Sequence, residues 1–366
     1  MGSHPQAPIK GRGATFNPGN RFRRDTREAV DDGWMPPAAE SGDDEPPPPL
    51  KTTVTIQRSR TIIARNASPD IPFTQSINPY QGCEHGCVYC YARPTHAYLD
   101  LSPGLDFETK LFAKPNAAAL LTAELAKPGY VCDAIAMGTN TDPYQPIERE
   151  WKITRQILEV LSACEHPVSI VTKSALVERD IDLLAPMAAK NLARVYVSIT
   201  TLDRDLARTL EPRAAAPHRR LAAVKALSEA GIPVGVMTAP IIPQLTDKDL
   251  EAILDAASAN GALYAGWTLV RLPHEVKDLF RDWLAQHYPL RAEHVMSMIQ
   301  QMRGGRDNDP QFGSRMRGQG LFADLISRRF DVACQRLGLN RERVPMDTSR
   351  FTPPRTDVQR AQLTLF

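Results

Sequence analysis

The stretch NPYQGCEHGCVYCYARPTH, residues 78–96, carries three cysteines in the spacing Cys-x3-Cys-x2-Cys. They are Cys83, Cys87 and Cys90. The residues just before them, 73–78, have the pattern of a short β-strand, which places the cysteines on the loop that follows it. Loops at the carboxyl ends of parallel strands are where such folds carry their sites. The stretch therefore predicts a thiol-based site on a parallel α/β fold.

Three clustered thiolates suit either zinc or an iron–sulfur cluster. A structural zinc site needs four protein ligands, and His85 or His96 could supply the fourth. A four-iron cluster on three thiolates leaves one iron without a protein ligand, which is useful where another molecule must bind there. The residues alone leave both kinds of site open.

Composition limits what the rest of the chain does. The 366 residues are 42% hydrophobic, enough to bury a large core, and the formal net charge is only +2. Any nucleic-acid contact must then come from local basic patches. We find neither an apolar signal-peptide segment nor a run long enough to cross a bilayer, so we expect a cytoplasmic protein without membrane contact. The scattered Cys132, Cys164 and Cys334 are expected to be buried thiols, not disulfides.

After the cysteines, short apolar runs alternate with longer helical patterns. Such alternation predicts repeated βα units around a parallel sheet. Counting the strand before the cysteines, we expect about six units, which is too few for a closed eight-stranded barrel. The pattern thus predicts an α/β fold, either a partial barrel or an open doubly wound sheet.

Three parts are expected along the chain. Residues 1–50 are rich in Pro, Gly, Asp and Arg without apolar periodicity, and they predict a disordered arm. Residues 51–290 form the βα core. Residues 291–366 predict a helical extension, interrupted by the Gly/Arg-rich loop at 303–320 and closed by a flexible tail.

The cysteine spacing, with the aromatic Tyr89 just before the third cysteine, resembles the radical S-adenosylmethionine (SAM) enzymes. Residues 76–267 look like the spore-photoproduct-lyase-like branch, the DNA repair photolyase type. The segments KGRGA, DDGW, SPDIPF and LDFETKLFAK are similar to an uncharacterised bacterial subfamily within it. The resemblance implies a partial (β/α)6 TIM-like barrel and a [4Fe-4S] cluster on Cys83, Cys87 and Cys90. It also implies reductive cleavage of SAM to methionine and a 5′-deoxyadenosyl radical.

The resemblance further implies SAM-binding positions at successive strand ends. Residues 138–142 would meet the amino group of SAM, Lys173 its carboxylate and Ser198 its ribose, while residues 238–242 would line the adenine. The expected set is Tyr89, Gly138, Thr139, Asn140, Asp142, Lys173, Ser198, Glu211, Arg213, Ala239 and Pro240. From the residues alone, these positions could also be ordinary turns, strand ends or surface pairs.

One departure from the resemblance concerns the hydrogen-atom donor. Spore photoproduct lyases carry a cysteine at the end of the second strand, whereas residues 137–142 contain none and Cys132 stands at the start of that strand. Tyr91 and Tyr144 are possible substitutes. The departure puts thymine-dimer reversal in doubt, leaves SAM cleavage untouched, and leaves the catalytic residue unassigned.

The chain end suggests a partner. Gln362, Leu363, Leu365 and Phe366 resemble the short peptide by which bacterial repair and replication proteins dock on the sliding clamp. With the basic loop at 303–320, this favours a nucleic-acid substrate, and radical chemistry needs a flavodoxin or ferredoxin as electron donor. Two alternatives stay open: a radical SAM enzyme acting on a peptide or small molecule, and a zinc-bearing nucleic-acid-binding module without catalysis.

Overall fold

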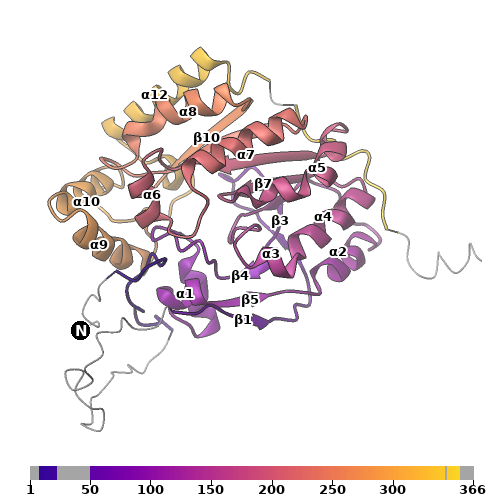
Figure 1. Ribbon diagram of the computed structural model, residues 1–366, viewed down its shortest axis with the longest axis horizontal. Coiled ribbons are helices and arrows are strands. Elements are labelled where there is room, and N and C mark those ends of the chain that lie inside the picture. Colours follow the sequence, from indigo (N-terminus) through magenta and orange to yellow (C-terminus); the bar gives the residue numbers. More distant parts are fainter. Residues whose placement is uncertain (1–7, 23–49, 343, 355–366) are drawn as a thin grey trace, which may run out of the picture.

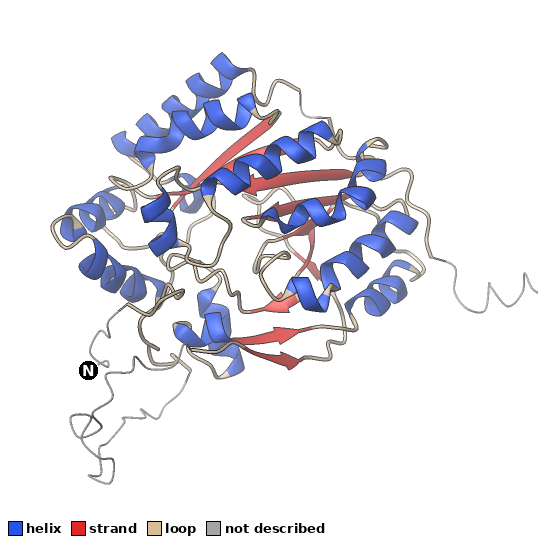
Figure 2. Cartoon of the chain, viewed as in Figure 1, coloured by secondary structure: helices blue, strands red, loops and turns tan. Residues whose placement is uncertain are grey.

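A seven-stranded sheet forms the centre of the computed structural model, which describes residues 8–22, 50–342 and 344–354 (Figures 1 and 2). The strand order is β10-β9-β8-β7-β6-β3-β2, parallel throughout except for β2, which runs antiparallel to β3. The strands are β2 Ile63–Arg65, β3 Gln75–Ile77, β6 Ile135–Met137, β7 Val168–Thr172, β8 Ala193–Ser198, β9 Val234–Ile241 and β10 Tyr264–Leu269. The six parallel strands follow one another in chain order, without the reversal of a doubly wound sheet, and within the described ranges the sheet does not close. The predicted partial barrel is confirmed.

Helices connect the parallel strands and pack along the sheet (Figure 2). They include α2 Ala117–Leu125, α3 Glu148–Trp151, α4 Ile153–Ala163, α5 Ile181–Ala188, α6 Arg204–Leu210, α7 Pro217–Glu229 and α8 Leu250–Ala259, with short 3-10 turns η2 Ala175–Asp180 and η3 Asp247–Asp249. Helix α4 buries Ile153, Ile157 and Leu161, the spacing of one helical face. Helix α7 gives way to Gly231, whose positive φ of 76° suits the turn after a helix. The predicted βα units are confirmed.

A second, three-stranded sheet lies beside the first (Figure 1). Its order is β1-β5-β4, with β1 Thr53–Ile56 parallel to β5 Lys110–Ala113 and β4 Tyr80–Gln81 antiparallel to β5. The 3-10 helix η1 Arg93–Leu99 and helix α1 Leu105–Thr109 fill the connection between β4 and β5. The cysteine loop therefore follows β4, and the chain returns to the small sheet at β5.

The carboxyl-terminal helices are α9 Val276–His287, α10 Ala292–Gln301, α11 Ser314–Arg317 and α12 Leu321–Leu337. Helix α12 buries Ile326 and Phe330 in the main core, with the Phe330 ring centroid 6.4 Å from that of Trp267. The predicted helical extension thus shares one core with the barrel. The sliding-clamp motif, residues 362–366, lies outside the described residues.

Residues 344–354 cross the amino ends of the central strands. Arg194 donates a hydrogen bond of 2.7 Å to the carbonyl of Val344, and the amide of Thr352 donates one of 2.8 Å to the carbonyl of Cys164. Phe351 packs against Tyr130 and His166 with centroid distances of 5.3 and 5.2 Å. Among the described residues, none of the helices has the length and apolar character needed to traverse a bilayer.

The expectation of a disordered arm over residues 1–50 needs correction for residues 8–22, which we call the N-terminal strap. Arg12, Ala14 and Thr15 of the strap are buried, at 8%, 1% and 5% exposure. Ala14 and Thr15 donate to the carboxylates of Glu108 and Asp282, and Arg12 donates to the backbone carbonyl of Glu108. These polar contacts offset the low apolar content of the strap. Residues 1–7 and 23–49 lie outside the described residues.

Candidate functional site

The cysteine loop is a series of tight turns between β4 and η1. Its turns are closed by hydrogen bonds from the amide of Gly86 to the carbonyl of Cys83 (3.3 Å) and from Cys90 to Cys87 (3.2 Å). The amide of Cys83 also binds the carbonyl of Phe107 at 2.9 Å. All three cysteines are free thiols; Cys83 and Cys87 are buried and Cys90 is partly exposed. The loop thus gathers three unpaired thiols, one of them reachable from outside.

Two glycines make this loop possible. Gly82 and Gly86 have φ of 76° and 67°, in the left-handed region that favours glycine. A Cβ at Gly82 would lie 2.9 Å from the carbonyl oxygen of Phe107, and one at Gly86 would lie 2.8 Å from a carboxylate oxygen of Glu108. The loop packs too closely on residues 107–108 for a side chain at either position.

Two of the three thiols, Cys83 and Cys87, need a compensating positive charge before they can ionise. Burial raises the pKa of Cys83 well above its usual value and that of Cys87 to about 12, with nearby negative charges adding to the effect. Metal ligation requires thiolates, so an iron or zinc centre would have to supply the compensating charge. These two thiols are therefore suited to binding a cationic centre and unsuited to reacting as free thiolates.

The zinc alternative finds little geometric support. Within the described ranges, no three His, Cys, Asp or Glu side chains are placed to share one metal ion. Each proposed fourth ligand has one ring nitrogen engaged elsewhere: Nδ1 of His85 lies 3.4 Å from Asp142, and Nε2 of His96 lies 2.9 Å from the carbonyl oxygen of Lys110, while Nδ1 of His96 is buried without a hydrogen-bond partner. A four-iron cluster fits the three cysteines better because each thiolate binds a different iron, so the sulfurs need not converge on one point.

The expected SAM-binding residues gather at the same end of the sheet as the cysteine loop. Gly138 follows β6, Lys173 follows β7, Ser198 ends β8, and Ala239 and Pro240 stand near the end of β9. Parallel strands end on one edge, so these positions face the loop that follows β3 and β4. Gly138 has φ of 88°, and a Cβ there would lie 1.9 Å from the carbonyl oxygen of Val171. Its missing side chain lets β6 and β7 end close together.

Asn78, which the sequence did not single out, fixes the segment after β6. Its side-chain oxygen accepts hydrogen bonds from the amides of Asn140 (3.1 Å) and Thr141 (3.3 Å), and its amide group donates to the Thr139 hydroxyl at 3.3 Å. The hydroxyl of Tyr91 donates to the carbonyl of Thr139. Residues flanking the cysteines on both sides therefore hold the segment expected to meet the SAM amino group.

Asp142 joins the cysteine loop to the ends of β6 and β7. Its carboxylate accepts hydrogen bonds of 2.7 Å from the Thr172 hydroxyl and from the Lys173 amide, and it faces His85. Burial works to raise the pKa of Asp142, but His85 and these hydrogen bonds outweigh it and the pKa is lowered. The carboxylate is thus ionised and fully engaged with protein groups.

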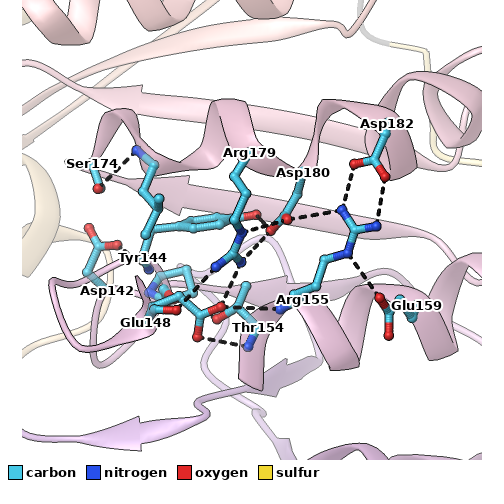
Figure 3. Close-up of polar contacts among 12 residues, drawn as sticks. Asp142, Tyr144, Glu148, Thr154, Arg155, Glu159, Ser174, Arg179, Asp180 and Asp182 are labelled. Carbon is cyan, nitrogen blue, oxygen red and sulfur yellow. Dashed lines mark hydrogen bonds and ion pairs between the residues drawn. The ribbon is translucent and has the colours of Figure 1, made fainter. Parts of the chain in front are cut away.

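A buried polar network stands behind Asp142 (Figure 3). Arg179 bridges Glu148 (2.7 Å) and Asp180 (2.8 Å), while the Tyr144 hydroxyl donates to Asp180 at 3.0 Å. Arg155 adds an ion pair to Asp180 at 3.3 Å. Glu148 and Asp180 are both fully buried. The network ties the turn after β6 to η2 after β7, the two segments that carry Gly138 and Lys173.

Tyr89 and Glu211 form the wall between the cysteine loop and β8. The Tyr89 hydroxyl donates to Glu211, which also accepts from Thr200 at 2.6 Å and is ion-paired with the buried Arg220. Burial alone would raise the pKa of Glu211, but the charges of Arg220 and Lys173 outweigh burial and lower the pKa to about 2. Both carboxylate oxygens are occupied, so Glu211 positions Tyr89.

Arg213 contacts the cysteine loop from the other side. Its guanidinium lies 3.1 Å from the carboxylate of Glu84, and its amide donates to the carbonyl of His85 at 3.2 Å. The side chain is 39% exposed, so it can also reach outward.

The structure places the candidate hydrogen-atom donors in different surroundings. Tyr144 is fully buried and donates to Asp180. Tyr91 is 48% exposed and adjoins Cys90. Cys132 precedes β6, at the end of the sheet opposite the cysteine loop, as expected from the sequence.

Comparison with known proteins agrees with this geometry. Residues 77–257 match the model of the radical SAM superfamily. An uncharacterized protein of Methanocaldococcus jannaschii is 30% identical over 219 residues, covering 60% of this chain and 78% of the archaeal one. The chain belongs to the radical SAM superfamily. An uncharacterized protein of Mycobacterium tuberculosis is 40% identical over 221 residues, 60% of this chain; the match spans 65% of the mycobacterial protein's length.

Among solved structures, spore photoproduct lyase complexed with dinucleoside spore photoproduct has a similar fold. The TM-score is 0.57 at 16% identity, with 78% of this chain and 80% of the lyase chain covered. This likeness shows the shared fold. Membership of the radical SAM superfamily implies a [4Fe-4S] cluster and SAM as cofactors, and the three cysteines fit that cluster by number and by their placement as free thiols in one loop.

Several residues of this site carry no signal in the sequence. Asn78, Glu108 and Arg220 act through contacts with residues distant in the chain, which no spacing rule reveals. Arg93 lies within the cysteine stretch, and its proximity to Cys90 is the one sequence signal that could have identified it as part of the site.

Proposed function

We propose that this protein is a radical SAM enzyme that acts on nucleic acid, with the cluster on Cys83, Cys87 and Cys90. A cluster bound there, once reduced by a flavodoxin or ferredoxin, would supply the electron for cleavage of SAM to methionine and a 5′-deoxyadenosyl radical. The chain's own residues would hold SAM and substrate in place.

SAM would be bound by the strand ends beside the cysteine loop. Lys173 offers a point charge for the SAM carboxylate, and the backbone of residues 138–140 offers acceptors for its amino group. Ser198 would contact the ribose, and Ala239 and Pro240 the adenine. Asp142, Glu211 and Arg213 are engaged with the cysteine loop or its support, so we assign them to positioning.

The observation that carries the choice of nucleic acid is a surface beside Cys90, the arginine–aromatic rim: Tyr91, Arg271, Phe312 and Arg315. The two rings are exposed and the two arginines are partly buried. The Cζ atom of Arg271 lies 5.3 Å from the Tyr91 ring centroid, and that of Arg315 lies 4.6 Å from the Phe312 centroid. Phe312 is 58% exposed. Exposed rings interleaved with guanidinium groups suit bases and phosphates of an unpaired strand.

Of the two rim arginines, Arg315 is paired with Asp70 at 2.6 Å, so Arg271 supplies the uncompensated positive charge. Among the described residues, no carboxylate forms an ion pair with Arg271, and its Nε is buried without a hydrogen-bond partner. Arg303 holds the rim loop to β10 by donating to the carbonyls of Val270 (2.6 Å) and Arg315 (2.8 Å). The loop is thus fixed against the end of β10. The dinucleoside named with the spore photoproduct lyase structure supports the same substrate class.

For a reaction that returns a hydrogen atom to the product, Tyr91 is the better of the two candidates. It is exposed, adjoins Cys90 and contacts the segment expected to meet SAM. Tyr144 is enclosed and bound to Asp180, which assigns it to the supporting network.

The first experiment is anaerobic. The protein is reconstituted with iron and sulfide, reduced, given SAM and assayed for 5′-deoxyadenosine, with Cys90→Ala as the test variant and Cys132→Ala as its control. We expect the nucleoside from the parent and from Cys132→Ala, and none from Cys90→Ala. A colourless parent that binds one zinc per chain and leaves SAM intact would contradict the proposal.

The substrate class is tested separately, by fluorescence anisotropy with a single-stranded oligonucleotide over a series of salt concentrations. We expect Arg271→Gln to weaken binding about tenfold and to reduce the salt dependence. Arg328→Gln, an exposed arginine on α12, is the control and should bind as the parent does. Equal binding by both variants, or tight binding of a peptide instead, would favour the peptide or small-molecule alternative.

The sliding-clamp contact stays a proposal for residues 362–366. A Phe366→Ala variant should lose binding to a purified bacterial clamp while its SAM cleavage is unchanged.

A further inference from the structure

The N-terminal strap lies directly on the cysteine loop. A Cβ placed on Gly13 would stand only 1.8 Å from the carbonyl oxygen of Gly86, which lies between Cys83 and Cys87. Ala14 packs in the same buried cluster as Cys87, Val88 and Tyr89. The two backbones touch with no side chain between them.

A buried carboxylate joins the strap to the loop. Glu108 accepts hydrogen bonds from the amides of Gly13 (3.0 Å) and Ala14 (2.9 Å) and pairs with Arg93 at 2.5 Å. The side chains of Glu108 and Arg93 are completely buried. Arg93 in turn donates to the carbonyls of Gly86 (3.1 Å) and Cys87 (2.9 Å). The carbonyls of the cysteine loop are therefore held through Arg93 and Glu108 by the strap.

The strap also connects the two ends of the open sheet. Thr15 donates to Asp282 on α9 at 2.6 Å, and Arg21 forms an ion pair of 3.0 Å with Glu275 at the start of α9. Helix α9 follows β10, the last parallel strand, whereas the cysteine loop follows the first. In a closed barrel, paired strands would join these ends. Here the strap makes the connection at the level of the cysteines.

We propose that the N-terminal strap is part of the cluster site: it holds the Cys83–Cys90 loop in the shape that retains the cluster and covers the loop backbone from solvent. Gly13, Glu108 and Arg93 are then positioning residues for the cysteines. The inference rests on the cluster that family membership implies and is independent of the substrate.

A pair of glycine variants tests this. Gly13→Ala inserts a methyl group between the strap and Gly86 and should lift the strap from the loop. Gly19→Ala makes the same chemical change in the same strap, at a position where a Cβ meets nothing within 4 Å and the backbone needs no glycine. Both variants are reconstituted as full-length protein. The readouts are iron and sulfide per chain, the rate of iron loss to a chelator, the paramagnetic resonance spectrum of the reduced cluster, and trypsin cleavage after Arg12.

We expect Gly13→Ala to lose iron about tenfold faster than the parent, to show an altered cluster spectrum and to be cut faster after Arg12. Gly19→Ala should match the parent in all four. Melting temperatures of the metal-free proteins separate an effect on the cluster from general instability. If the strap only stabilised the fold, Gly13→Ala would lower the melting temperature and leave the cluster spectrum unchanged. Equal iron loss from the two variants overturns the inference, whatever the trypsin result. If the parent takes up no cluster, both the proposed function and this inference are wrong. If the two variants lose iron at the same rate, only this inference is wrong.

Discussion

The carboxylate of Glu211 and the guanidinium of Arg220 form a buried ion pair beneath the cysteine loop, both side chains at 2% exposure or less. Arg220 also donates to the carbonyl of Ser198 at 3.0 Å, and Glu211 receives the hydroxyl of Tyr89. One ion pair thus sets the position of a strand end expected to contact SAM and of the residue beside the third cysteine.

Replacing Glu211 by Gln should destabilise the protein by about 3–5 kcal/mol, because it leaves the Arg220 charge buried without a counter-ion. The measurement is the free energy of unfolding in urea. Glu229→Gln is the control, since the Lys225–Glu229 pair is largely exposed and should contribute little. If the two variants unfold at the same urea concentration, the buried ion pair does not contribute the expected free energy of unfolding.

Gly138→Ala should prevent SAM binding and destabilise the protein by about 3 kcal/mol or more, because its Cβ would collide with the Val171 carbonyl and separate β6 from β7. Gly129→Ala is the control. Gly129 has a similar φ of 79°, but a Cβ there meets nothing, so only the backbone strain of about 1 kcal/mol is expected. SAM binding by calorimetry and urea unfolding measure the two effects; equal losses would refute the close approach of the strands.

Stability should fall as the pH is lowered from 6.5 to 4 because of His166. Burial lowers the pKa of this imidazole from 6.5 to about 4. Between these values the folded protein binds fewer protons than the unfolded chain, so acid favours unfolding, by about 3 kcal/mol at pH 4. Comparing urea unfolding of the parent and His166→Gln across this range isolates the effect. A parent and variant with parallel pH profiles would show that His166 titrates normally.

Tyr91→Phe should leave the cluster intact and permit 5′-deoxyadenosine formation, but turnover of a nucleic-acid substrate should fall at least about tenfold if Tyr91 returns the hydrogen atom. Tyr144→Phe is the control: it removes the hydrogen bond to Asp180 and should cost about 1–2 kcal/mol of stability without changing the products. Product analysis by mass spectrometry in deuterated water distinguishes the two. Normal turnover by Tyr91→Phe would exclude this role.

The βα core could be predicted from the sequence because its signals are local. Helix α4 repeats its apolar residues at helical spacing, and β8 is buried on both faces and apolar apart from Arg194 and Ser198. The strands of the small sheet could not be predicted from periodicity, because β4 has two residues and β5 follows α1 directly. Periodicity needs longer segments than these.

The cysteines and strand-end positions could likewise be read from motif and resemblance, but their support could not. The strap looks like a disordered, basic arm because its stabilising partners, Glu108 and Asp282, are roughly 95 and 267 residues away in the chain. Composition predicts disorder from low apolar content alone. It cannot anticipate that two backbone amides will share one buried carboxylate.

The carboxyl-terminal segment has a practical consequence. Thr352 binds beside Cys164 and Phe351 covers His166, both just before β7, so the chain at residue 354 stands at the amino ends of the strands. The arginine–aromatic rim lies at the opposite end of the sheet, beside the carboxyl ends of the strands. A surface-immobilised sample anchored beyond residue 354 would present the rim outward, and oligonucleotide, reductant and SAM could be flowed over the same tethered molecules without the support blocking their entry.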